Sequence, residues 1–222
     1  MTNRDESQNP ASTLSPSATA EEKVWANFRE ACPEFQRFLR NQTGARWFVY
    51  EEASPDPGEN CLCFWEYTSA FGTFYASMRW ILLNTLYMLP SSALKRAGLR
   101  LYGARIHPTA YLAPQVFIDP LFPSLLTLEE GALLGLGTRI ALHEQTGNRF
   151  RAGRVRIGRG ATVGAFAQIA CGVEIGEYAR IGFGSVVLRD VPAYAIAVGN
   201  PARVVSRIDP ASSSPLPSRD PR

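Results

Sequence analysis

The chain repeats every six residues between Ile157 and Pro192. The six blocks read IGRGAT, VGAFAQ, IACGVE, IGEYAR, IGFGSV and VLRDVP, and each opens with an aliphatic residue and carries a small residue or valine in its fifth place. A strand alternates every two residues and a helix turns every 3.6, so neither keeps this register. The period predicts short extended pieces joined by bends, three to each turn of a triangular coil. Stacked coils must then supply the core, because one unit cannot bury its apolar face alone.

The same register extends back to Ile106, with two interruptions. The first is a short insertion at Leu121–Leu125, and the second is the segment Glu144–Val155. Full burial of one aliphatic side chain contributes roughly 1.5 to 3 kcal/mol, so a shared interior would give a substantial core. The twelve aliphatic positions predicted to point into it are Ile106, Leu112, Ile118, Leu128, Leu134, Ile140, Ile157, Val163, Ile169, Ile175, Ile181 and Val187.

These blocks resemble the hexapeptide repeat of the left-handed β-helix, or isoleucine patch, acyltransferases over about Leu99 to Arg207. The sequence SVVLRDVPAYAIAVGNPARVV, Ser185 to Val205, is similar to the closing signature of that family. The resemblance implies a mainly β fold, a left-handed parallel β-helix of about four to five coils with an α-helical N-terminal extension, assembled as a homotrimer. The left hand comes from the resemblance alone, since parallel crossovers are normally right-handed.

Composition divides the chain into four parts. Residues 1–20 and 208–222 are rich in Ser and Pro and are predicted to be disordered, 21–100 form a helical and aromatic N-terminal extension, and 101–207 form the β-helix acyltransferase domain. Apolar residues recur at near-helical spacing from Glu21 to Arg40, where Pro33 is expected to interrupt or restart the helix.

An aromatic stretch runs from Phe64 to Tyr87 and is too short, after Arg79, to span a membrane. Two interpretations remain open. A helix pair here would cover the open end of the stacked strands or form trimer contacts. Alternatively, with Lys95, Arg96 and Arg100 following, it would lie on an anionic membrane surface.

The four cysteines show no zinc-type pairing, and no signal peptide precedes them. The sequence therefore predicts a cytoplasmic protein with free thiols, with peripheral contact at the inner membrane face as the alternative. Cys171, inside a repeat block, is interpreted as a packing or surface thiol rather than a nucleophile.

The chain has two histidines, His107 and His143. Acyl transfer from a thioester to a hydroxyl needs a base to remove the hydroxyl proton, and histidine suits that role. The resembled family carries its general base in a loop leaving a coil, where His143 falls. His107, in an ordinary His-Pro bend, is the reserve candidate. Glu144 could orient His143, although adjacent side chains on an extended segment point in opposite directions.

The resemblance also implies an acetyl-CoA groove between neighbouring subunits. The positions that match the family's cofactor contacts are Ala165, Phe183, Leu188, Arg189 and Arg203. Phe183 stands where a small residue is common, and Leu188 replaces a residue that often carries a hydroxyl. Both departures predict a reshaped groove.

After His143, the eleven residues 149–159 contain five arginines: Arg149, Arg151, Arg154, Arg156 and Arg159. They indicate either a site for an anionic acceptor or cofactor phosphate, or a solvated basic loop. Without an aromatic stacking platform, the pattern does not favour nucleic acid.

The leading hypothesis is an acyl-CoA-dependent O-acetyltransferase acting on a sugar or other small hydroxyl acceptor. The β-helix is shared with zinc carbonic anhydrases, but a zinc site of that kind needs three histidines and the chain has two. A non-catalytic β-helix, serving as a scaffold or a membrane-associated assembly protein, is the remaining alternative.

Overall fold

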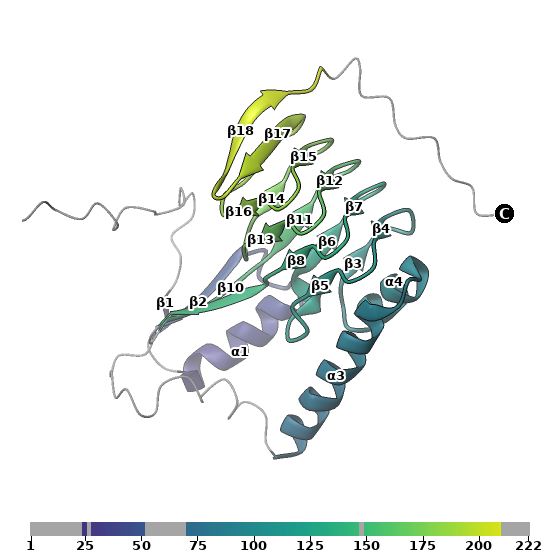
Figure 1. The fold of residues 1–222 in the computed structure, drawn as a ribbon. Helices are drawn as coiled ribbons and strands as arrows, with labels where there is room; N and C mark the ends of the chain where they lie inside the picture. The colour runs from purple at the N-terminus through teal and green to yellow at the C-terminus, as the bar shows by residue number, and fades with distance from the viewer. Residues whose placement is uncertain (1–23, 26–27, 52–69, 147–148, 210–222) are drawn as a thin grey trace, which may run out of the picture.

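The fold was analysed in a computed structural model that describes residues 24–25, 28–51, 70–146 and 149–209. The predicted disordered ends lie outside the described residues, apart from Ile208 and Asp209. Short strands stack along one axis, with the N-terminal helices at one end and along one side (Figure 1). The strands of the coils are β3 (Arg105–Ile106), β4 (Tyr111–Leu112), β5 (Phe117–Ile118), β6 (Leu126–Leu128), β7 (Leu133–Leu134), β8 (Arg139–Ile140), β11 (Val155–Ile157), β12 (Thr162–Val163), β13 (Gln168–Ile169), β14 (Glu174–Ile175), β15 (Arg180–Ile181) and β16 (Val186–Val187).

Each coil contributes one strand to each of three parallel sheets, which confirms the β-helix. The sheet orders are β14-β11-β6-β3, β18-β17-β15-β12-β7-β4 and β16-β13-β8-β5, where β17 is Ala195–Gly199 and β18 is Ala202–Arg207. All neighbours in these sheets are parallel except β18, which is antiparallel to β17. Four complete coils lie in the described residues, and β17 begins a fifth before β18 folds back on it as a hairpin. The predicted four to five coils are therefore confirmed.

The predicted six-residue register is the register of the sheets. Ile106 pairs with Leu128, Leu128 with Ile157, and Ile157 with Ile175. All twelve predicted aliphatic side chains are buried, none more than 6% exposed. The fifth places are buried as well, and the hydroxyl of Thr138 donates to the carbonyl oxygen of Gly135 at 2.8 Å, so this polar group is satisfied inside the core.

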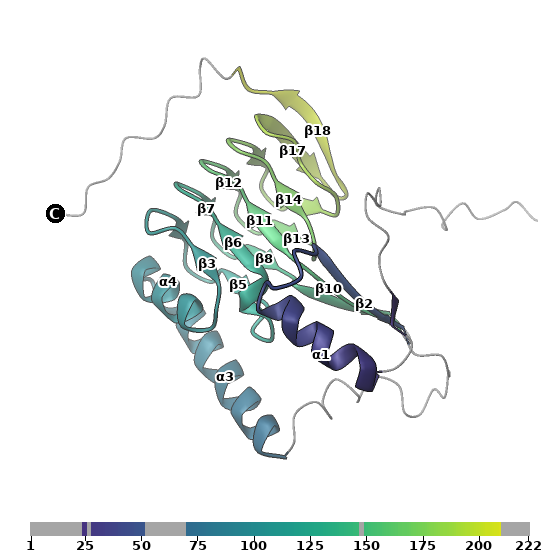
Figure 2. The ribbon, with the colours of Figure 1, turned by 180° about the vertical axis from the view of Figure 1, so that it is seen from behind.

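Helix α4 (Ser92–Leu101) and the C-terminal end of α3 (Ala70–Met88) lie at the first coil, and the N-terminal part of α3 projects away from it (Figures 1 and 2). The buried Lys95 amine donates to the carbonyl oxygen of Ala113 at 2.5 Å, and Arg96 donates to that of Ala110 at 2.9 Å. Arg100 bonds the carbonyl oxygen of Ile106. The basic residues that the membrane interpretation used are thus bound to the first coil, as a capping helix pair requires. Within the described residues, no helix combines the length and apolar character that a membrane span needs.

The N-terminal extension also contains strands that the sequence did not reveal. Helix α1 (Phe28–Leu39) precedes β2 (Trp47–Glu51), which pairs with β10 (Arg149–Gly153). Together with β1 (Val24–Trp25) and β9 (His143–Thr146) they form a sheet of order β1-β2-β10-β9. The second interruption of the repeat therefore forms the hairpin β9–β10, and the outer edge of β10 pairs with β2.

Pro33 lies inside α1, so the predicted interruption of this helix is wrong. Proline removes one backbone donor and crowds the preceding turn. The helix continues because Phe35 and Phe38, on the turn that follows Pro33, are 2% and 1% exposed and pack into the core. Their burial offsets the lost hydrogen bond.

The coil stack predicts a sharp contrast between two leucines. Leu134 is fully buried between Leu112 and Val163 of the adjoining coils, whereas Leu101 is 81% exposed at the end of α4. We expect Leu134→Ala to lower the free energy of unfolding by about 2 to 5 kcal/mol through lost burial and a cavity. Leu101→Ala should change it by less than about 1 kcal/mol. Denaturant titrations followed by circular dichroism would measure both, and equal losses would contradict the coil assignment.

Candidate functional site

His143 and Asp119 meet at the corner that follows the sheet β16-β13-β8-β5. Asp119 comes directly after β5, and His143 comes three residues after Ile140 in the next coil. The two coils are held together there because the backbone N–H of Asp119 donates to the carbonyl oxygen of Ile140 at 3.0 Å. His143 Nδ1 contacts Asp119 Oδ2, and Asp119 Oδ1 accepts the N–H of Leu121 at 2.9 Å.

This contact defines which nitrogen of His143 is available. Asp119 is buried, and an ionised carboxylate only accepts hydrogen bonds. Nδ1 therefore donates its proton to Asp119, and the lone pair of the neutral imidazole is on Nε2. The side chain of His143 is 30% exposed, which leaves the ring accessible to a substrate. A buried carboxylate that fixes the tautomer of an accessible imidazole is an arrangement suited to general base catalysis.

Two aromatic rings fix the plane of the imidazole. Phe150, on β10, stacks on it with ring centroids 5.8 Å apart and planes inclined by 28°. Phe122, in the first interruption just before the 3₁₀ turn η1 (Pro123–Leu125), meets it edge-on at 5.4 Å. Both interruptions of the repeat therefore contribute a wall to the same site.

The N-terminal segment runs along this corner past the next two coils. Arg46 donates from Nε to the carbonyl oxygen of Gly172 at 2.6 Å, and its Nη1 donates to Asp190 Oδ2 at 2.8 Å. The ring of Trp47 lies on Gly172, where a Cβ atom would come within 2.0 Å of it. Gly172 also has φ +70°, so both its space and its backbone conformation require glycine.

The orienting carboxylate is Asp119, which was not predicted from the sequence, and not Glu144. Glu144 pairs across the hairpin with Arg151 and accepts from its Nη1 at 2.8 Å. It points away from the imidazole, as the alternation of an extended segment requires. A signal for Asp119 was present in the sequence: it follows Ile118, the last aliphatic position before the first interruption, so it shares its corner with His143.

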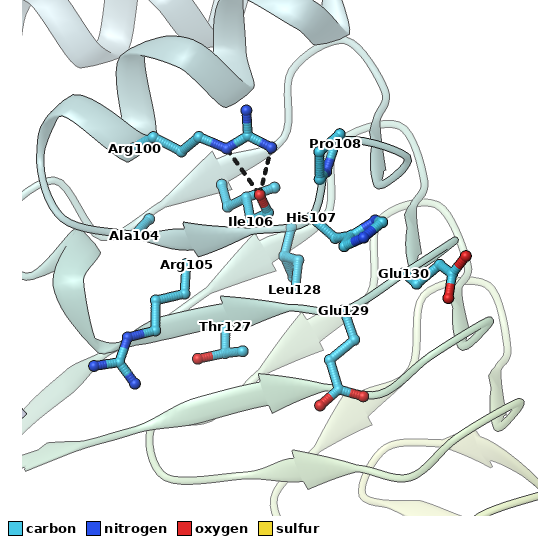
Figure 3. Close-up of a pocket in the computed structure, with 10 residues that line it drawn as sticks. All are labelled: Arg100, Ala104, Arg105, Ile106, His107, Pro108, Thr127, Leu128, Glu129 and Glu130. Atoms are coloured by element: carbon cyan, nitrogen blue, oxygen red, sulfur yellow. Dashed lines mark hydrogen bonds between the residues drawn. The ribbon is translucent and has the colours of Figure 1, made fainter. Parts of the chain in front are cut away.

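His107 lies apart from this site, in an open depression against the first two coils (Figure 3). The depression is lined by Arg100, Arg105, His107, Thr127, Glu129 and Glu130 among others, and neither Asp119 nor His143 is part of it. His107 Nδ1 contacts the Thr109 hydroxyl at 2.8 Å and accepts the Thr109 N–H at 3.3 Å. The structure therefore assigns His107 a turn-stabilising contact.

The predicted acetyl-CoA positions lie at two different corners of the chain. Ala165 and Phe183 follow β12 and β15, where the carbonyl oxygen of Ala165 accepts the N–H of Gly184 at 2.9 Å. Phe183 is 75% exposed and meets the edge of Phe166 at 5.5 Å. Leu188 and Arg189 follow β16, at the corner of His143, and are exposed. Arg203 is exposed on β18, so one chain does not gather these five residues into one pocket.

The five arginines after His143 have protein partners. Arg149 lies 3.9 Å from Glu51, Arg151 pairs with Glu144, Arg156 pairs with Glu129, and Arg159 lies 3.1 Å from Glu177. Arg154 donates to the carbonyl oxygens of Ala45 and Phe38, and burial lowers its pKa to about 10, with a smaller effect from Arg105. The side chains of Arg149, Arg156 and Arg159 are 42%, 42% and 51% exposed, so this part of the group is solvated. Arg149 and Arg154 also connect the N-terminal segment with residues 149–154.

Comparison with known proteins agrees with this fold. A family model described as bacterial transferase hexapeptide (six repeats) matches residues 154–189. A serine acetyltransferase of Synechococcus elongatus is 33% identical over 157 residues, which are 64% of this chain and 60% of that protein. A dTDP-3-amino-3,6-dideoxy-alpha-D-galactopyranose 3-N-acetyltransferase of Aneurinibacillus thermoaerophilus is 56% identical over 52 residues, 23% of this chain and 27% of that protein.

Solved structures show the same architecture. A hexapeptide-repeat acetyltransferase of Vibrio cholerae O1 biovar eltor, crystallised with acetyl coenzyme A, matches 62% of this chain and 89% of its own, with a TM-score of 0.53 and 17% identity. A galactoside acetyltransferase in complex with coenzyme A matches 79% of this chain and 90% of its own, also with a TM-score of 0.53 and 17% identity. The match of residues 154–189 to this family model confirms the resemblance drawn from the repeat. The chain spans 60% of the length of the cyanobacterial relative.

Cys171 lies one residue before Gly172, at the corner of His143. Its side chain is 3% exposed, so it is a packing residue. Burial raises the pKa of its thiol to about 12, with the charge of Glu144 adding to the shift. Only roughly one molecule in ten thousand would carry the reactive thiolate at pH 8. We expect iodoacetamide to leave Cys171 unmodified in the folded protein and to modify it fully in guanidinium chloride, as measured by peptide mass spectrometry. Rapid modification in the folded state would contradict this packing role.

Proposed function

We propose that the protein is an acetyl-CoA-dependent O-acetyltransferase for a small hydroxyl acceptor, with His143 as general base. The observation that carries the proposal is the contact between His143 Nδ1 and the buried Asp119, which leaves Nε2 as a basic nitrogen on an accessible ring. The named relatives add support, because those reported above are acetyltransferases and their shared segment is the repeat that builds this corner.

The proton path follows from this geometry. His143 Nε2 accepts the hydroxyl proton of the acceptor while the acceptor oxygen bonds to the thioester carbonyl carbon. As the carbon–sulfur bond breaks, the imidazolium returns that proton to the departing thiolate. Asp119 stays ionised throughout and stabilises the positive charge that His143 carries between the two transfers. Phe122 and Phe150 hold the ring in plane, so the base needs little reorganisation when the acceptor arrives.

We propose further that the donor binds between copies of the chain, in a homotrimer. Within one chain, Ala165 and Phe183 lie at one corner, and Leu188 and Arg189 lie with His143 at another. A groove that used both corners would therefore need a second copy. The exposed rings and small residues of the first corner suit the apolar part of coenzyme A, and the exposed cations Arg189 and Arg203 suit its phosphates.

By their printed names, the proteins reported above acetylate serine, a galactoside and, at nitrogen, an amino sugar. Serine and sugar hydroxyls are therefore the first acceptors to test, with an amino sugar as the amine alternative. We expect His143→Ala to lower kcat by about a hundred- to ten-thousandfold, since that is the usual contribution of a general base. The KM for acetyl-CoA should change little. A thiol-release assay measures both, and His107→Ala is the matched control because it removes the other histidine. Undiminished turnover by His143→Ala would exclude His143 as the base.

Asp119 gives an independent test of the same site. An asparagine in its place can present its amide N–H to Nδ1, and this favours the imidazole tautomer whose proton is on Nε2, where the base needs its lone pair. We expect Asp119→Asn to lower kcat by about a hundredfold or more with little change in KM for acetyl-CoA. Glu144→Gln is the control, because that carboxylate follows His143 but pairs with Arg151. Equal effects of the two substitutions would argue that general charge, and not tautomer control, is what the site requires.

A further inference from the structure

We propose that Phe35, on α1, is a positioning residue for His143, from which it is separated by 108 positions in the chain. The proposal rests on the proposed function for its catalytic consequence. It adds a role for the N-terminal extension, whose helix has no sequence feature that connects it with acyl transfer. The structural basis is a cluster of four rings behind the imidazole, which we name the ring cluster: Phe35, Phe48, Phe122 and Phe150.

Phe35 is the hub of the ring cluster. Its ring centroid lies 4.7 Å from that of Phe48, 5.5 Å from Phe122 and 5.9 Å from Phe150. The contacts to Phe122 and Phe150 are edge-on, with planes inclined by 78° and 89°. Such edge-to-face contacts are directional, so they fix ring orientation as well as distance. Phe35 is 2% exposed.

The two rings that Phe35 supports are the two that contact His143. Phe122 and Phe150 also meet each other, with centroids 6.2 Å apart. They come from the two interruptions of the repeat. Without the ring of Phe35, Phe122 and Phe150 would each lose an edge-on contact that fixes their orientation. The plane of His143 would then be less well defined by these two rings, and would depend more on the contact of Nδ1 with Asp119.

The helix that carries Phe35 is itself fastened to the corner. Arg154 donates to the carbonyl oxygen of Phe38 at the end of α1 and to that of Ala45 before β2. Both hydrogen bonds go to backbone carbonyl oxygens, so a substitution of the Phe38 side chain retains them and removes only the contact of its ring with the guanidinium, at 4.5 Å from the ring centroid. These hydrogen bonds hold α1 at a defined distance from β10. A ring on α1 can therefore serve as a fixed support for the ring of Phe150 on the hairpin.

Phe38 provides a matched control on the same helix. It is the same residue type, is 1% exposed, and contacts Phe35 at 6.3 Å and Phe48 at 6.0 Å. Among the described residues, its ring contacts do not include Phe122, Phe150 or His143. If Phe35 acts only as a core residue, Phe35→Leu and Phe38→Leu should have equivalent effects on the site.

The test compares these two variants by kinetics and by the imidazole tautomer. We expect Phe35→Leu to lower kcat roughly ten- to a hundredfold, the scale of a misplaced catalytic group, with KM for acetyl-CoA within about twofold of the parent. Phe38→Leu should keep kcat within about twofold while losing similar thermal stability. Nitrogen-15 NMR of the side chains reports the tautomer directly, because the chain has two histidines and His107→Gln assigns the second. We expect the His143 signals of Phe35→Leu to move toward an averaged mixture of tautomers, and those of His107 to stay unchanged.

The outcomes separate this inference from the proposed function. Unchanged His143 signals in Phe35→Leu, or equal loss of kcat in both variants, would overturn the positioning role. If His143→Ala keeps its turnover, the proposed function fails, yet the NMR comparison still decides whether Phe35 positions the imidazole. Should Phe35→Leu not fold, Phe35→Met replaces it, since a long flexible side chain fills the space without supplying a ring. The same two readouts then apply.

Discussion

The stacking of aliphatic side chains in three parallel rows is the constraint on which the rest of this molecule depends. Each row places one residue per coil directly over its counterpart, as Leu112, Leu134, Val163 and Ile181 do in one sheet. A coil cannot slip against its neighbour without moving its aliphatic positions out of the interior, so burial fixes the register along the whole axis. The corners are then fixed too, and residues far apart in the sequence can be brought to the same corner with little freedom of position.

The site uses this property at the two places where the repeat stops. An insertion at a corner leaves the rows intact, because the strands on either side keep their partners. It adds side chains that have no role in the stack. Asp119 ends one coil and His143 leaves the next, so the backbone bond between Asp119 and Ile140 sets their separation. The rigid part of the fold thus provides the hydrogen-bonding pair, and the inserted segments provide the rings around it.

The rows were predictable from the sequence because they depend on a local period: all twelve aliphatic positions could be assigned by counting in sixes. His143 was predictable from its place at an interruption and from the scarcity of histidine. Asp119 was not identified, because its role depends on a corner shared by two coils, where it meets a histidine 24 positions further along the chain. The pairing of β2 and the role of the Phe35 ring were harder still to predict from the sequence. Their partners lie about a hundred positions away, and short apolar segments such as WFVYE do not specify which edge they pair with.

The same separation in sequence accounts for three of the arginines that follow His143, because Arg149, Arg151 and Arg154 contact the N-terminal segment. A segment that must dock on a hairpin from a remote part of the chain presents carbonyl oxygens and carboxylates that would otherwise lose their hydrogen bonds to water. Arg154 donates to two carbonyl oxygens, one at the end of α1 and one before β2. From the N-terminal segment, Arg46 donates to the carbonyl oxygen of Gly172 and to the carboxylate of Asp190. Guanidinium groups suit this task, because each presents several donors in a fixed plane. Arg46 and Arg154 are therefore structural connections, and within the described part of the chain the imidazole keeps Asp119 as its ionic partner, which determines its tautomer.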